Sequence, residues 1–313
     1  MSRRHLFVAD PLDGMNIWQD STFGVMLCCQ QRGHAIFHCG TEGLLGRAGA
    51  PAARCRPVTV QEVQGDHFTL GEAETVPLAQ FDVIWMRKDP PFDMTYIAAT
   101  YVLDLAPPST RVVNQTNSLR DWNEKAIVLR FPDLCPEGML SRNIDELKRF
   151  QAEVGGSVVL KPLLYSGGNG IVALHPGDLN TNALLEISTA QGQEFVLAQR
   201  YQPEVVEGDK RVILIDGEVG GALLRVPPAD DLRGNIHVGA RTELCDLTAE
   251  ERRVCEALRA PLKEAGHLFV GIDLIGGKLT EINVTSPTGI REILMGGGPD
   301  LAAALIDAAL MDR

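Results

Sequence analysis

The chain has 313 residues, of which 45% are hydrophobic and 22% charged, and its formal net charge at pH 7 is −12. This length accommodates two or three domains with a sizeable core, and the acidic balance without a basic stripe argues against nucleic acid as a partner. No apolar run approaches the roughly 20 residues of a membrane span, and the N-terminus lacks the layout of a signal peptide. The seven cysteines are scattered and include no CxxC pair, so we expect a reduced, cytoplasmic protein without a disulfide framework or zinc site.

The first third of the chain has the alternation of strands and helices that is typical of an α/β domain. Residues 20–33 predict a helix with Asp20 or Ser21 as its N-cap and Gly33 as its end. Strands are predicted at residues 4–10, 34–40 and 81–89, the last two separated by a loop-rich middle. Together these elements predict a small doubly wound sheet. The first strand ends in DPLDG and not in G-x-G-x-x-G, so the dinucleotide-binding fingerprint is missing.

The next region combines two helices with a glycine-rich loop. Helices are predicted near residues 118–131 and at residues 143–156, the second with Asn143 as its N-cap. Residues 157–175 (SVVLKPLLYSGGNGIVALH) then show a strand, a glycine-rich loop and a second strand, whereas a P-loop leads from a strand into a helix. Such a loop can lay backbone N–H groups over phosphates, although an ordinary hairpin loop is the simpler interpretation of this segment taken alone.

In the last third we predict strands, hairpins and two helices. We expect a strand at 194–201, a hairpin at 209–226 that turns at Asp216-Gly217, a helix at 249–266 and a C-terminal helix at 300–312. Thr248 and Glu251 have the spacing of a capping box at the start of the 249–266 helix. Residues 227–242 show no periodicity and many breakers, and a loop of that length in a compact domain is usually functional or disordered.

Two acids and an amide, Asp273, Glu281 and Asn283, lie among apolar residues in the predicted hairpin GIDLIGGKLTEIN. Side chains alternate across a strand, so Asp273 shares a face with Glu281 only if the connection between them has an odd number of residues. A two-residue Gly-Gly turn is commoner, but it would mix Glu281 with the apolar face. We therefore predict a three-residue loop at 276–278 and a patch of three oxygen ligands that suits Mg²⁺. A solvated polar face of an amphipathic hairpin is the competing interpretation.

Several stretches together resemble one family, the bacterial glutathione synthetases of the ATP-grasp superfamily. They are MRKDPPFD (86–93), NSLRDWNEK (117–125), LKP with the later GGNG, GDKRV (208–212), RGN (233–235) and LTEINVTSPTGIRE (279–292), in the order of the family. The pairing of RKDPPFD with EINVTSPTGIRE is the most specific signal. This chain departs from the family pattern at Leu164, Tyr165 and Ser166, which precede the glycines of the loop, and at Ala240, where a second glycine is common.

The resemblance implies an ATP-grasp fold of the α/β (α+β) class, with ATP between two antiparallel sheets. The implied domains are an N-terminal Rossmann-like pre-ATP-grasp domain (1–122), a small lid domain with the glycine-rich loop (123–198), and a C-terminal antiparallel-sheet domain (199–313) that holds the metal site and a flexible loop (227–242).

The resemblance also assigns residues to ligands. For ATP it implies Lys125 and Lys161 at the phosphates, Gly167, Gly168 and Gly170 in the loop, Gln199, Arg200, Tyr201 and Gln202 at the hinge that meets adenine, Asp209 at the ribose, and Lys210 beside it. Asp273, Glu281 and Asn283 match ligands of Mg²⁺, with Mn²⁺ as the alternative. Catalytic roles are implied for Arg211, Arg225, Arg233 and Asn235, and substrate binding for Arg87, Ser286, Thr288 and Arg291.

The implied reaction joins the cysteinyl carboxylate of γ-L-glutamyl-L-cysteine to glycine through an acyl phosphate, giving glutathione, ADP and phosphate. A carboxylate and a polyphosphate about 4 Å apart repel each other by roughly 4 kcal/mol at an effective dielectric near 20, so the cleft needs local cations although the chain is acidic. Partners would be these small molecules, and the tetrameric state of relatives implies a homo-oligomer.

Two other readings of the sequence compete with this one. Another ATP-grasp carboxylate–amine ligase, acting on a different peptide or amino acid, would share the lysines and metal ligands but should lack the RKDPPFD and TSPTGIRE matches. A nucleotide-binding module without catalysis would be expected to have lost one of the metal ligands, and all three are present. We therefore predict an enzyme.

Overall fold

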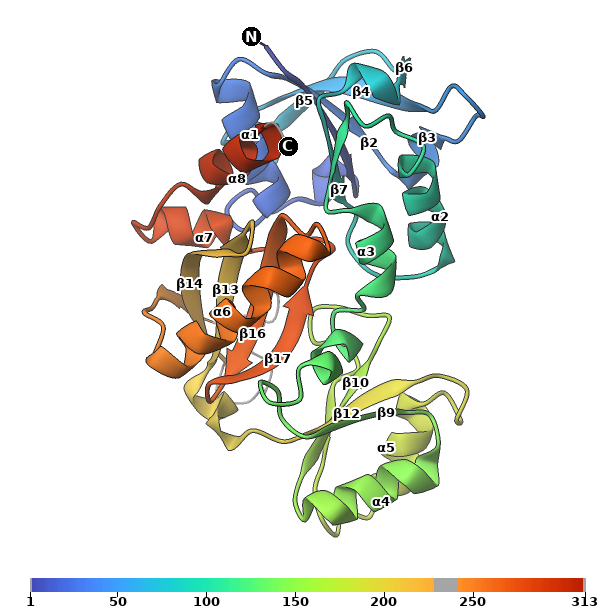
Figure 1. The fold of residues 1–313 in the computed structure, drawn as a ribbon, viewed down its shortest axis with the longest axis vertical. Helices are drawn as coiled ribbons and strands as arrows, with labels where there is room; N and C mark the ends of the chain where they lie inside the picture. The colour runs from blue at the N-terminus through green and yellow to red at the C-terminus, as the bar shows by residue number, and fades with distance from the viewer. Residues whose placement is uncertain (1, 228–240, 312–313) are drawn as a thin grey trace.

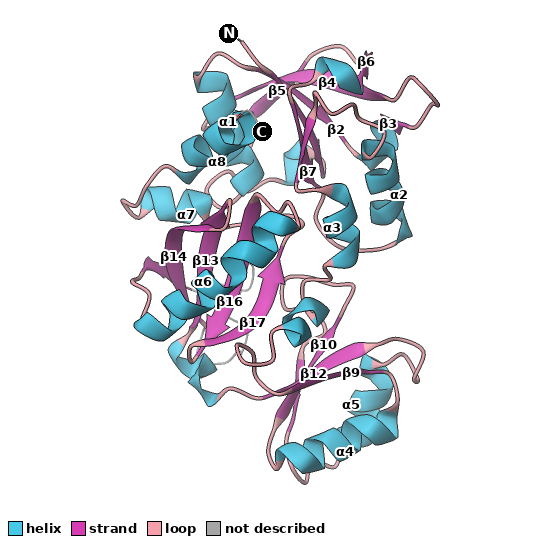
Figure 2. Ribbon diagram, in the orientation of Figure 1, coloured by secondary structure: helices cyan, strands magenta, loops and turns pink. Residues whose placement is uncertain are grey.

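The computed structural model describes residues 2–227 and 241–311. Its strands form three sheets in chain order, called here the N-terminal, central and C-terminal sheets. In Figure 1 the N-terminal sheet (blue to cyan) lies at one end of the molecule, the central sheet (green to yellow) at the other, and the C-terminal sheet (gold to orange) between them. Helices lie against all three sheets (Figure 2), so the α/β class is as predicted.

The N-terminal sheet has a parallel centre. Its strands are β1 (Arg4–Ala9), β2 (Ala35–Cys39), β3 (Leu44–Leu45), β4 (Ala52–Val60), β5 (Phe68–Leu70), β6 (Glu74–Pro77), β7 (Val83–Arg87) and β8 (Arg111–Val113), and its helices are α1 (Ser21–Gln31), α2 (Met94–Leu103) and α3 (Thr116–Asp121). The order β2-β1-β7-β8 is parallel throughout, as in a doubly wound sheet. Asp20 caps α1 by accepting a hydrogen bond from the backbone N–H of Phe23, which confirms the predicted helix start.

The loop-rich middle predicted between β2 and β7 is wrong. This segment contains β4, which pairs antiparallel with β2 and carries β5 and β6 along its length. The sequence of β4, AARCRPVTV, alternates between buried and more exposed positions, but the buried side chains in its first half are the small ones of Ala53 and Cys55. Small apolar residues interrupted by arginines and a proline give a weak strand signal. Helix α2 was also not predicted.

The central sheet is antiparallel and is covered on one face by two helices (Figures 1 and 2). Its strands are β9 (Gly138–Ser141), β10 (Val158–Pro162), β11 (Val172–Leu174) and β12 (Val196–Arg200), and its helices are α4 (Ile144–Val154) and α5 (Thr181–Ser188). The predicted strand–loop–strand of 157–175 is therefore confirmed as β10 and β11. Asn143 caps α4 as predicted, and Gly155 ends it in the left-handed conformation with φ 65°.

The helix predicted near 118–131 is two shorter pieces, α3 and a 3-10 segment at Ala126–Arg130. The side-chain oxygen of Asn123 accepts hydrogen bonds from the backbone N–H groups of Lys125 (3.2 Å) and Ala126 (3.1 Å). An asparagine that bonds to the backbone in this way competes with helical hydrogen bonds and starts a new turn. Other 3-10 turns lie at Leu12–Gly14, Thr41–Gly43, Leu78–Gln80 and Pro203–Glu207.

The C-terminal sheet is antiparallel in the order β15-β14-β13-β16-β17. Its strands are β13 (Asp209–Ile215), β14 (Glu218–Val226), β15 (Arg241–Leu244), β16 (Phe269–Ile275) and β17 (Lys278–Asn283), and the helices that follow or interrupt them are α6 (Ala249–Glu264), α7 (Ile290–Met295) and α8 (Leu301–Leu310). The turn at Asp216-Gly217 and the capping box of Thr248 and Glu251 are confirmed. Residues 228–240 of the predicted loop lie outside the described residues, and its predicted end at 242 is wrong because β15 begins at Arg241.

The hairpin of β16 and β17 has the predicted pairing but not the predicted loop. Asp273 lies opposite Glu281, and Gly271 lies opposite Asn283. The turn, however, is the two-residue Gly276-Gly277, and the register shifts between Asp273 and Leu274. Thr280 is the extra residue on its strand, and its hydroxyl donates to the backbone oxygen of Asp273 at 3.2 Å. A β-bulge therefore supplies the odd residue that we placed in the turn.

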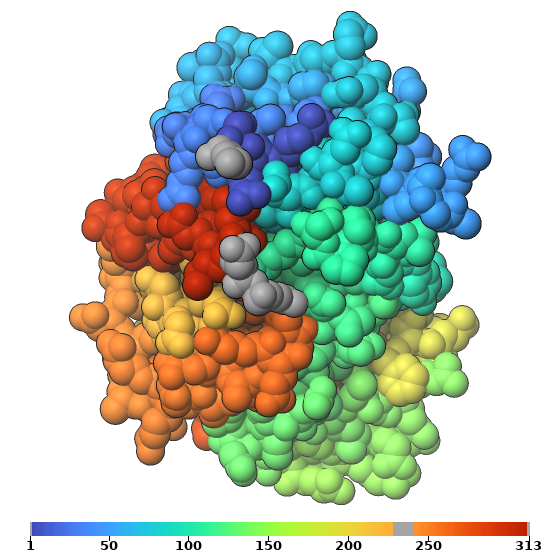
Figure 3. All heavy atoms as spheres, turned by 45° about the horizontal axis from the view of Figure 1, so that its top comes forward, coloured from blue at the N-terminus to red at the C-terminus, as the bar shows by residue number. Residues whose placement is uncertain are grey.

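The end of the chain returns to its beginning. Helix α8 packs beside α1, and Figure 3 shows the red C-terminal residues against the blue N-terminal ones on this face. Phe7 and Met26 share one buried cluster with Ile213, Leu305 and Ile306, so the N-terminal and C-terminal sheets rest on a common core. The central sheet has a smaller cluster of its own. The domain limits at 122/123 and 198/199 stay predictions.

Within residues 2–227 and 241–311, no helix is both long and apolar enough to cross a membrane. All seven cysteines are free.

Two buried histidines, His5 and His267, do not line the cavity between the central and C-terminal sheets. Trp85 donates its indole N–H to His5 Nδ1 (3.1 Å), so His5 carries its proton on Nε2, which lies 2.9 Å from His34 Nδ1. This tautomer leaves no lone pair on His5 Nε2 for a metal, although Cys29 lies nearby. Burial lowers the pKa of His5 to about 3, and burial lowers the pKa of His267, which packs against Trp122, to about 3 as well.

Acidification is expected to destabilise the fold through these two groups. Each histidine has a lower pKa in the folded than in the unfolded chain, so between the two values only the unfolded chain binds the proton. The free energy of unfolding therefore falls as pH drops from 6.5 towards 3. The loss is about 1.4 kcal/mol per pH unit for each group. Urea unfolding at pH 7.5, 6 and 5 should show this slope, and His267→Phe should reduce it by one group's share. His175→Phe, at an exposed histidine, serves as the control, and an unchanged slope in His267→Phe would contradict the assignment.

Candidate active site

A cavity of about 450 Å³ lies between the central and C-terminal sheets. It is lined from one side by β10, β12 and the glycine-rich loop, and from the other by β13, β14, β16 and β17. Fourteen of the residues predicted from the sequence line it: Lys125, Lys161, Gly167, Gly168, Gln199, Arg200, Tyr201, Gln202, Asp209, Arg211, Arg225, Asp273, Glu281 and Asn283. Residues that are far apart in the sequence therefore meet in one place.

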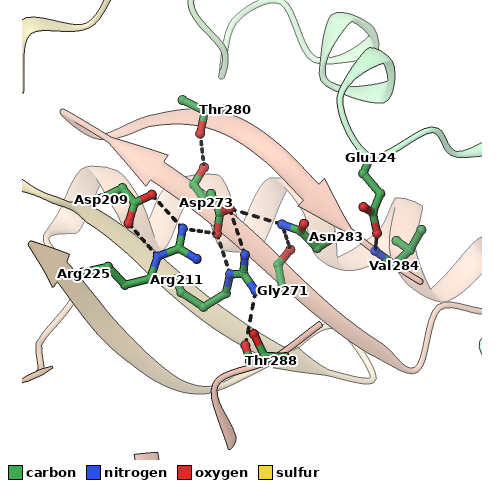
Figure 4. Close-up of polar contacts among 10 residues, drawn as sticks. All are labelled: Glu124, Asp209, Arg211, Arg225, Gly271, Asp273, Thr280, Asn283, Val284 and Thr288. Carbon is green, nitrogen blue, oxygen red and sulfur yellow. Dashed lines mark hydrogen bonds and ion pairs between the residues drawn. The ribbon is translucent and has the colours of Figure 1, made fainter. Parts of the chain in front are cut away.

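Three oxygen-bearing side chains gather at the end of the cavity formed by β16 and β17. Asn283 donates its amide N–H to the backbone oxygen of Gly271 (3.2 Å) and to Asp273 (3.3 Å), which leaves its carbonyl oxygen available (Figure 4). Glu281 lines the cavity, and its carboxylate makes no hydrogen bond or ion pair with the described residues. Two carboxylates and an amide oxygen are donors that suit a hard divalent cation. Glu281 and the Asn283 carbonyl are available for the predicted magnesium, whereas both oxygens of Asp273 already accept hydrogen bonds from Arg211 and would have to be shared with it.

Two arginines bind the acids of this wall in direct cross-strand pairs. The register of β13 places Arg211 opposite Asp273 and Asp209 opposite Arg225. Arg225 contacts both oxygens of Asp209 (2.6 and 2.7 Å) and one oxygen of Asp273 (3.1 Å). Arg211 contacts both oxygens of Asp273 (2.5 and 3.0 Å) and donates to the backbone oxygen of Thr288 at 3.2 Å (Figure 4). Bidentate pairs of this kind fix both partners.

Burial and neighbouring charges shift the pKa values of these acids and arginines in opposite directions. Burial alone would raise the pKa of Asp273, but the guanidinium groups of Arg211 and Arg225 outweigh it and hold that pKa well below its usual range. Burial raises the pKa of Asp209 in spite of Arg225. Burial alone would lower the pKa of Arg225, but Asp273 and Asp209 raise it. Two acids and two guanidinium groups thus balance each other.

Two lysines enter the cavity from the central part of the chain. Lys161, at the end of β10, is buried and donates to the backbone oxygen of Thr280 at 3.2 Å. Burial lowers its pKa, and the neighbouring acids, Glu281 first, act against that effect. Lys125 donates to the backbone oxygen of Tyr165, at the start of the glycine-rich loop. Lys161 therefore contacts β17, and Lys125 contacts the loop on the other side of the cavity.

The glycine-rich loop and the hinge border the remaining sides. Gly167, Gly168 and Gly170 have φ values of 70°, 78° and 72°, which favour glycine, although Gly170 does not itself line the cavity. In the hinge, the amide nitrogen of Gln199 is buried and has no hydrogen-bond partner among the described residues. Arg200 also lines the cavity, and its guanidinium group pairs with Glu137 at 2.7 Å. The hinge therefore offers the side-chain nitrogen of Gln199 to a ligand as an unpaired donor.

The structure does not bring Lys210 to the cavity. Neighbouring residues on a strand face opposite sides, so Asp209 and Arg211 face the cavity and Lys210 faces α6. Its ammonium group donates to the backbone oxygen of Asp246 (3.0 Å) and to Glu251 (2.8 Å). The family resemblance implied a contact between Lys210 and ATP, but this side chain lies on the face of β13 that is turned away from the cavity.

The four residues predicted to bind substrate lie beside the cavity, where the segment after β17 meets the N-terminal sheet. Arg87 is buried, donates to Thr22 and to the backbone oxygen of Pro287 (both 3.0 Å), and has one buried nitrogen, Nη1, without a partner among the described residues. The hydroxyl of Ser286 donates to Asp89. Arg291 is fixed by the backbone oxygen of Ile17 and by Glu62, and Thr288 bonds Arg211 through its backbone oxygen. Arg233 and Asn235 lie outside the described residues.

Sequence reasoning missed Glu124, which lines the cavity next to Lys125. Its carboxylate accepts hydrogen bonds from the backbone N–H groups of Val284 (2.9 Å) and Thr285 (3.0 Å) and from the hydroxyl of Thr285 (2.8 Å). The NEK motif contained this acid, but the segment was predicted as helix and gave no sign that the carboxylate reaches the residues directly after β17.

Two family models match most of the chain. The model described as the N-terminal domain of prokaryotic glutathione synthetase matches residues 4–120, and the model described as its ATP-grasp domain matches residues 124–296. The glutathione synthetase of Agrobacterium fabrum is 45% identical over 299 residues, which cover 96% of this chain and 93% of the relative. That of Brucella melitensis is 46% identical over 299 residues and covers 96% of each.

Solved structures with the same fold are more distant in sequence. A D-cycloserine synthetase superposes with a TM-score of 0.69 at 13% identity and covers 98% of both chains. A RimK-domain ATP-grasp protein from Sphaerobacter thermophilus has a TM-score of 0.66 at 17% identity, covering 98% of this chain and 100% of its own. At such identities the likeness concerns the fold alone, and the predicted ATP-grasp fold is confirmed.

Proposed function

Because the chain belongs to the prokaryotic glutathione synthetase family, we propose that the cavity between its central and C-terminal sheets is the active site of that family's reaction. The chain is an ATP-dependent carboxylate–amine ligase that forms glutathione from γ-glutamylcysteine and glycine. The observation that carries the assignment of the site is the meeting of Lys125 and Lys161 with Asp273, Glu281 and Asn283 in one cavity.

We propose that ATP lies along this cavity. The adenine would meet the hinge at 199–202, where the buried Gln199 amide nitrogen offers an unused donor. The phosphates would lie between the glycine-rich loop and the ammonium groups of Lys125 and Lys161, whose positive charges offset the phosphate charge. Asp209 stays a candidate for the ribose contact, although Arg225 holds both of its oxygens.

Asp273, Glu281 and Asn283 would hold Mg²⁺, because all three donors are hard oxygens, and Mn²⁺ stays the alternative, since it accepts the same donor set. A bound divalent cation neutralises phosphate charge and acts as a Lewis acid on the transferring phosphoryl group. Arg211 keeps Asp273 ionised and oriented, which preserves the donor set of this wall.

In the proposed reaction an oxygen of the cysteinyl carboxylate attacks the γ-phosphorus of ATP, and ADP leaves with the bond electrons. The amine of glycine then attacks the acyl carbon, loses a proton, and inorganic phosphate departs. Arg211 and Arg225 lie on the wall beside the metal ligands and would stabilise the negative charge that gathers on the transferred group. Arg233 and Asn235 stay predicted catalytic residues.

The γ-glutamyl end of the peptide would extend towards the N-terminal sheet. Arg87 supports this because its buried Nη1 has no partner among the described residues, and a guanidinium group suits a carboxylate. Ser286, Thr288 and Arg291 surround the same junction and stay predicted substrate contacts. We also propose a cytoplasmic location and a homo-oligomer, a tetramer by analogy with relatives.

The assay that tests the function measures ADP release with Mg-ATP, γ-glutamylcysteine and glycine, with each component omitted in turn. Release only in the complete mixture, together with a product of the mass of glutathione, is the expected result. Release that needs a different acceptor would assign the chain to a sister ligase. ATP binding without turnover would favour a non-catalytic module.

Lys161 and Lys210 offer a matched pair of substitutions for testing the site. Lys161→Met is expected to lower kcat/KM for ATP by a factor on the order of 10², since it removes a buried cation from the proposed phosphate site. Lys210→Met should leave kcat/KM within about threefold, because the side chain faces α6. Steady-state kinetics with varied ATP compares the two. Equal losses in both variants would remove the basis for placing the phosphates at Lys161.

A further inference from the structure

We propose that Glu124 is a positioning residue. It holds the end of β17, the strand that carries Glu281 and Asn283, in place relative to Lys125, the proposed phosphate contact next to it in the sequence. The inference rests on the proposed function, because it concerns how that active site is assembled. Glu124 was not among the residues expected from the sequence. It touches none of the three metal ligands by a hydrogen bond, so its effect would act through the backbone that carries them.

Glu124 binds the segment directly after Asn283. One carboxylate oxygen, Oε1, accepts hydrogen bonds from Val284 N–H, Thr285 N–H and the Thr285 hydroxyl, at 2.8 to 3.0 Å. Its backbone oxygen also accepts a hydrogen bond from the N–H of Ile282 at 2.9 Å. The residues on both sides of Asn283 are therefore fixed by one glutamate, and Figure 4 shows its contact with Val284.

The neighbouring residue ties the same stretch of chain to the other side of the cavity. Lys125 donates to the backbone oxygen of Tyr165 in the glycine-rich loop. The dipeptide Glu124-Lys125 thus connects the C-terminal sheet, through β17, with the loop of the central sheet. A displacement of Glu124 would change the distance between the metal ligands and the lysine that faces the phosphates.

The chemistry of the contact explains why a carboxylate stands here. Val284 and Thr285 are nearly fully buried, so their N–H groups need an acceptor inside the protein. A charged acceptor that receives three donors holds them more strongly than a neutral one. A glutamine keeps an acceptor oxygen of the same reach but loses the charge, whereas an alanine leaves both N–H groups unpaired.

The first test needs no turnover. Hydrogen exchange of the peptide covering 281–288 is measured in the ligand-free protein, and the affinity for ADP with Mg²⁺ is measured by calorimetry, for wild type, Glu124→Ala, Glu124→Gln and Thr285→Val. We expect faster exchange and about tenfold weaker Mg²⁺-dependent ADP binding in Glu124→Ala, with Glu124→Gln and Thr285→Val in between. Glu256→Gln, on the exposed face of α6, is the charge-matched control and should match wild type.

Steady-state kinetics provides the second readout. Loss of positioning should raise the Mg²⁺ concentration needed for half-maximal rate and lower kcat, while KM for γ-glutamylcysteine stays near its wild-type value. If Glu124→Ala does not fold, Glu124→Gln and Thr285→Val decide the question in the same assays.

Two results would overturn the proposal. Faster exchange at 281–288 with unchanged Mg²⁺ dependence and kcat would give Glu124 a purely structural role. A large loss of kcat with unchanged exchange would make it a direct ligand of substrate or metal instead. Wild-type protein that binds Mg-ADP but forms no glutathione would count against the proposed function and not against the role of Glu124, since exchange and calorimetry report on that role separately.

Discussion

Glu281→Gln is expected to lower kcat/KM by a factor on the order of 10² to 10³ while changing the free energy of unfolding by less than about 1 kcal/mol. The separation of the two effects follows from the contacts of the side chain. Asp273 is held by two arginines and Asn283 by Asp273 and Gly271, but the Glu281 carboxylate has no hydrogen-bond or ion-pair partner in the described parts of the chain. Its substitution breaks no hydrogen bond or ion pair of the described residues and weakens only the electrostatic support of Lys161, and it removes a charged oxygen donor from the cavity.

The measurement is ADP release at saturating γ-glutamylcysteine and glycine with varied Mg-ATP, combined with urea unfolding of the same preparations. Glu264→Gln, at an exposed position near the end of α6, removes a carboxylate of the same size and should behave as wild type in both assays. Activity within threefold of wild type in Glu281→Gln would exclude this carboxylate as a metal ligand. A large loss of stability would show that it has structural contacts after all.

The position of Glu281 shows which features of the hairpin can be predicted from the sequence and which cannot. Strict alternation of apolar residues in β16 and β17 requires Asp273, Glu281 and Asn283 on one face, and that requirement predicted the correct pairing. It could not locate the odd residue, because a longer turn and a bulge at Thr280 give the same pairing. The choice depends on local hydrogen bonds, such as that of the Thr280 hydroxyl to Asp273, which leave no periodic trace in the sequence.

Contacts between segments that are far apart in the sequence were even harder to predict from it. Family resemblance identified Arg211 and Arg225, but the pairing of Arg225 with Asp209 and of Arg211 with Asp273 depends on the registers of β13 with β14 and β16. The role of Glu124 depends on a contact with residues about 160 positions later in the chain. Neither a propensity nor a spacing reports such contacts, so they required the structure.

Arg225→Met is expected to lower the free energy of unfolding at pH 7.5 by about 3 to 5 kcal/mol, the usual cost of removing one partner of a buried ion pair. Met has a similar length and fills the space without charge. Arg211 still compensates Asp273, but Asp209 loses both of its hydrogen bonds to Arg225 although its side chain is only 14% exposed. The destabilisation would come from this uncompensated carboxylate more than from lost packing.

This origin predicts both a pH dependence and a rescue. In Arg225→Met, burial and the nearby Asp273 would raise the pKa of Asp209 in the folded protein further above its unfolded value. The folded state then binds more protons than the unfolded state between those two values, so the deficit relative to wild type should shrink as pH falls from 7.5 to 5.5. Comparing variant with wild type at each pH cancels the opposite contribution of His5 and His267, which both proteins share.

Asp209→Asn in the Arg225→Met background is the decisive variant, because an amide at this position has no charge to bury. It should recover roughly half of the lost stability at pH 7.5 and abolish the narrowing of the deficit at pH 5.5. Urea unfolding followed by far-UV circular dichroism measures all four proteins, with Asp209→Asn alone completing the cycle. If the double variant is no more stable than Arg225→Met, the loss of stability arises from packing. The ion pairs among Asp209, Arg225, Asp273 and Arg211 would then not stabilise this wall of the cavity.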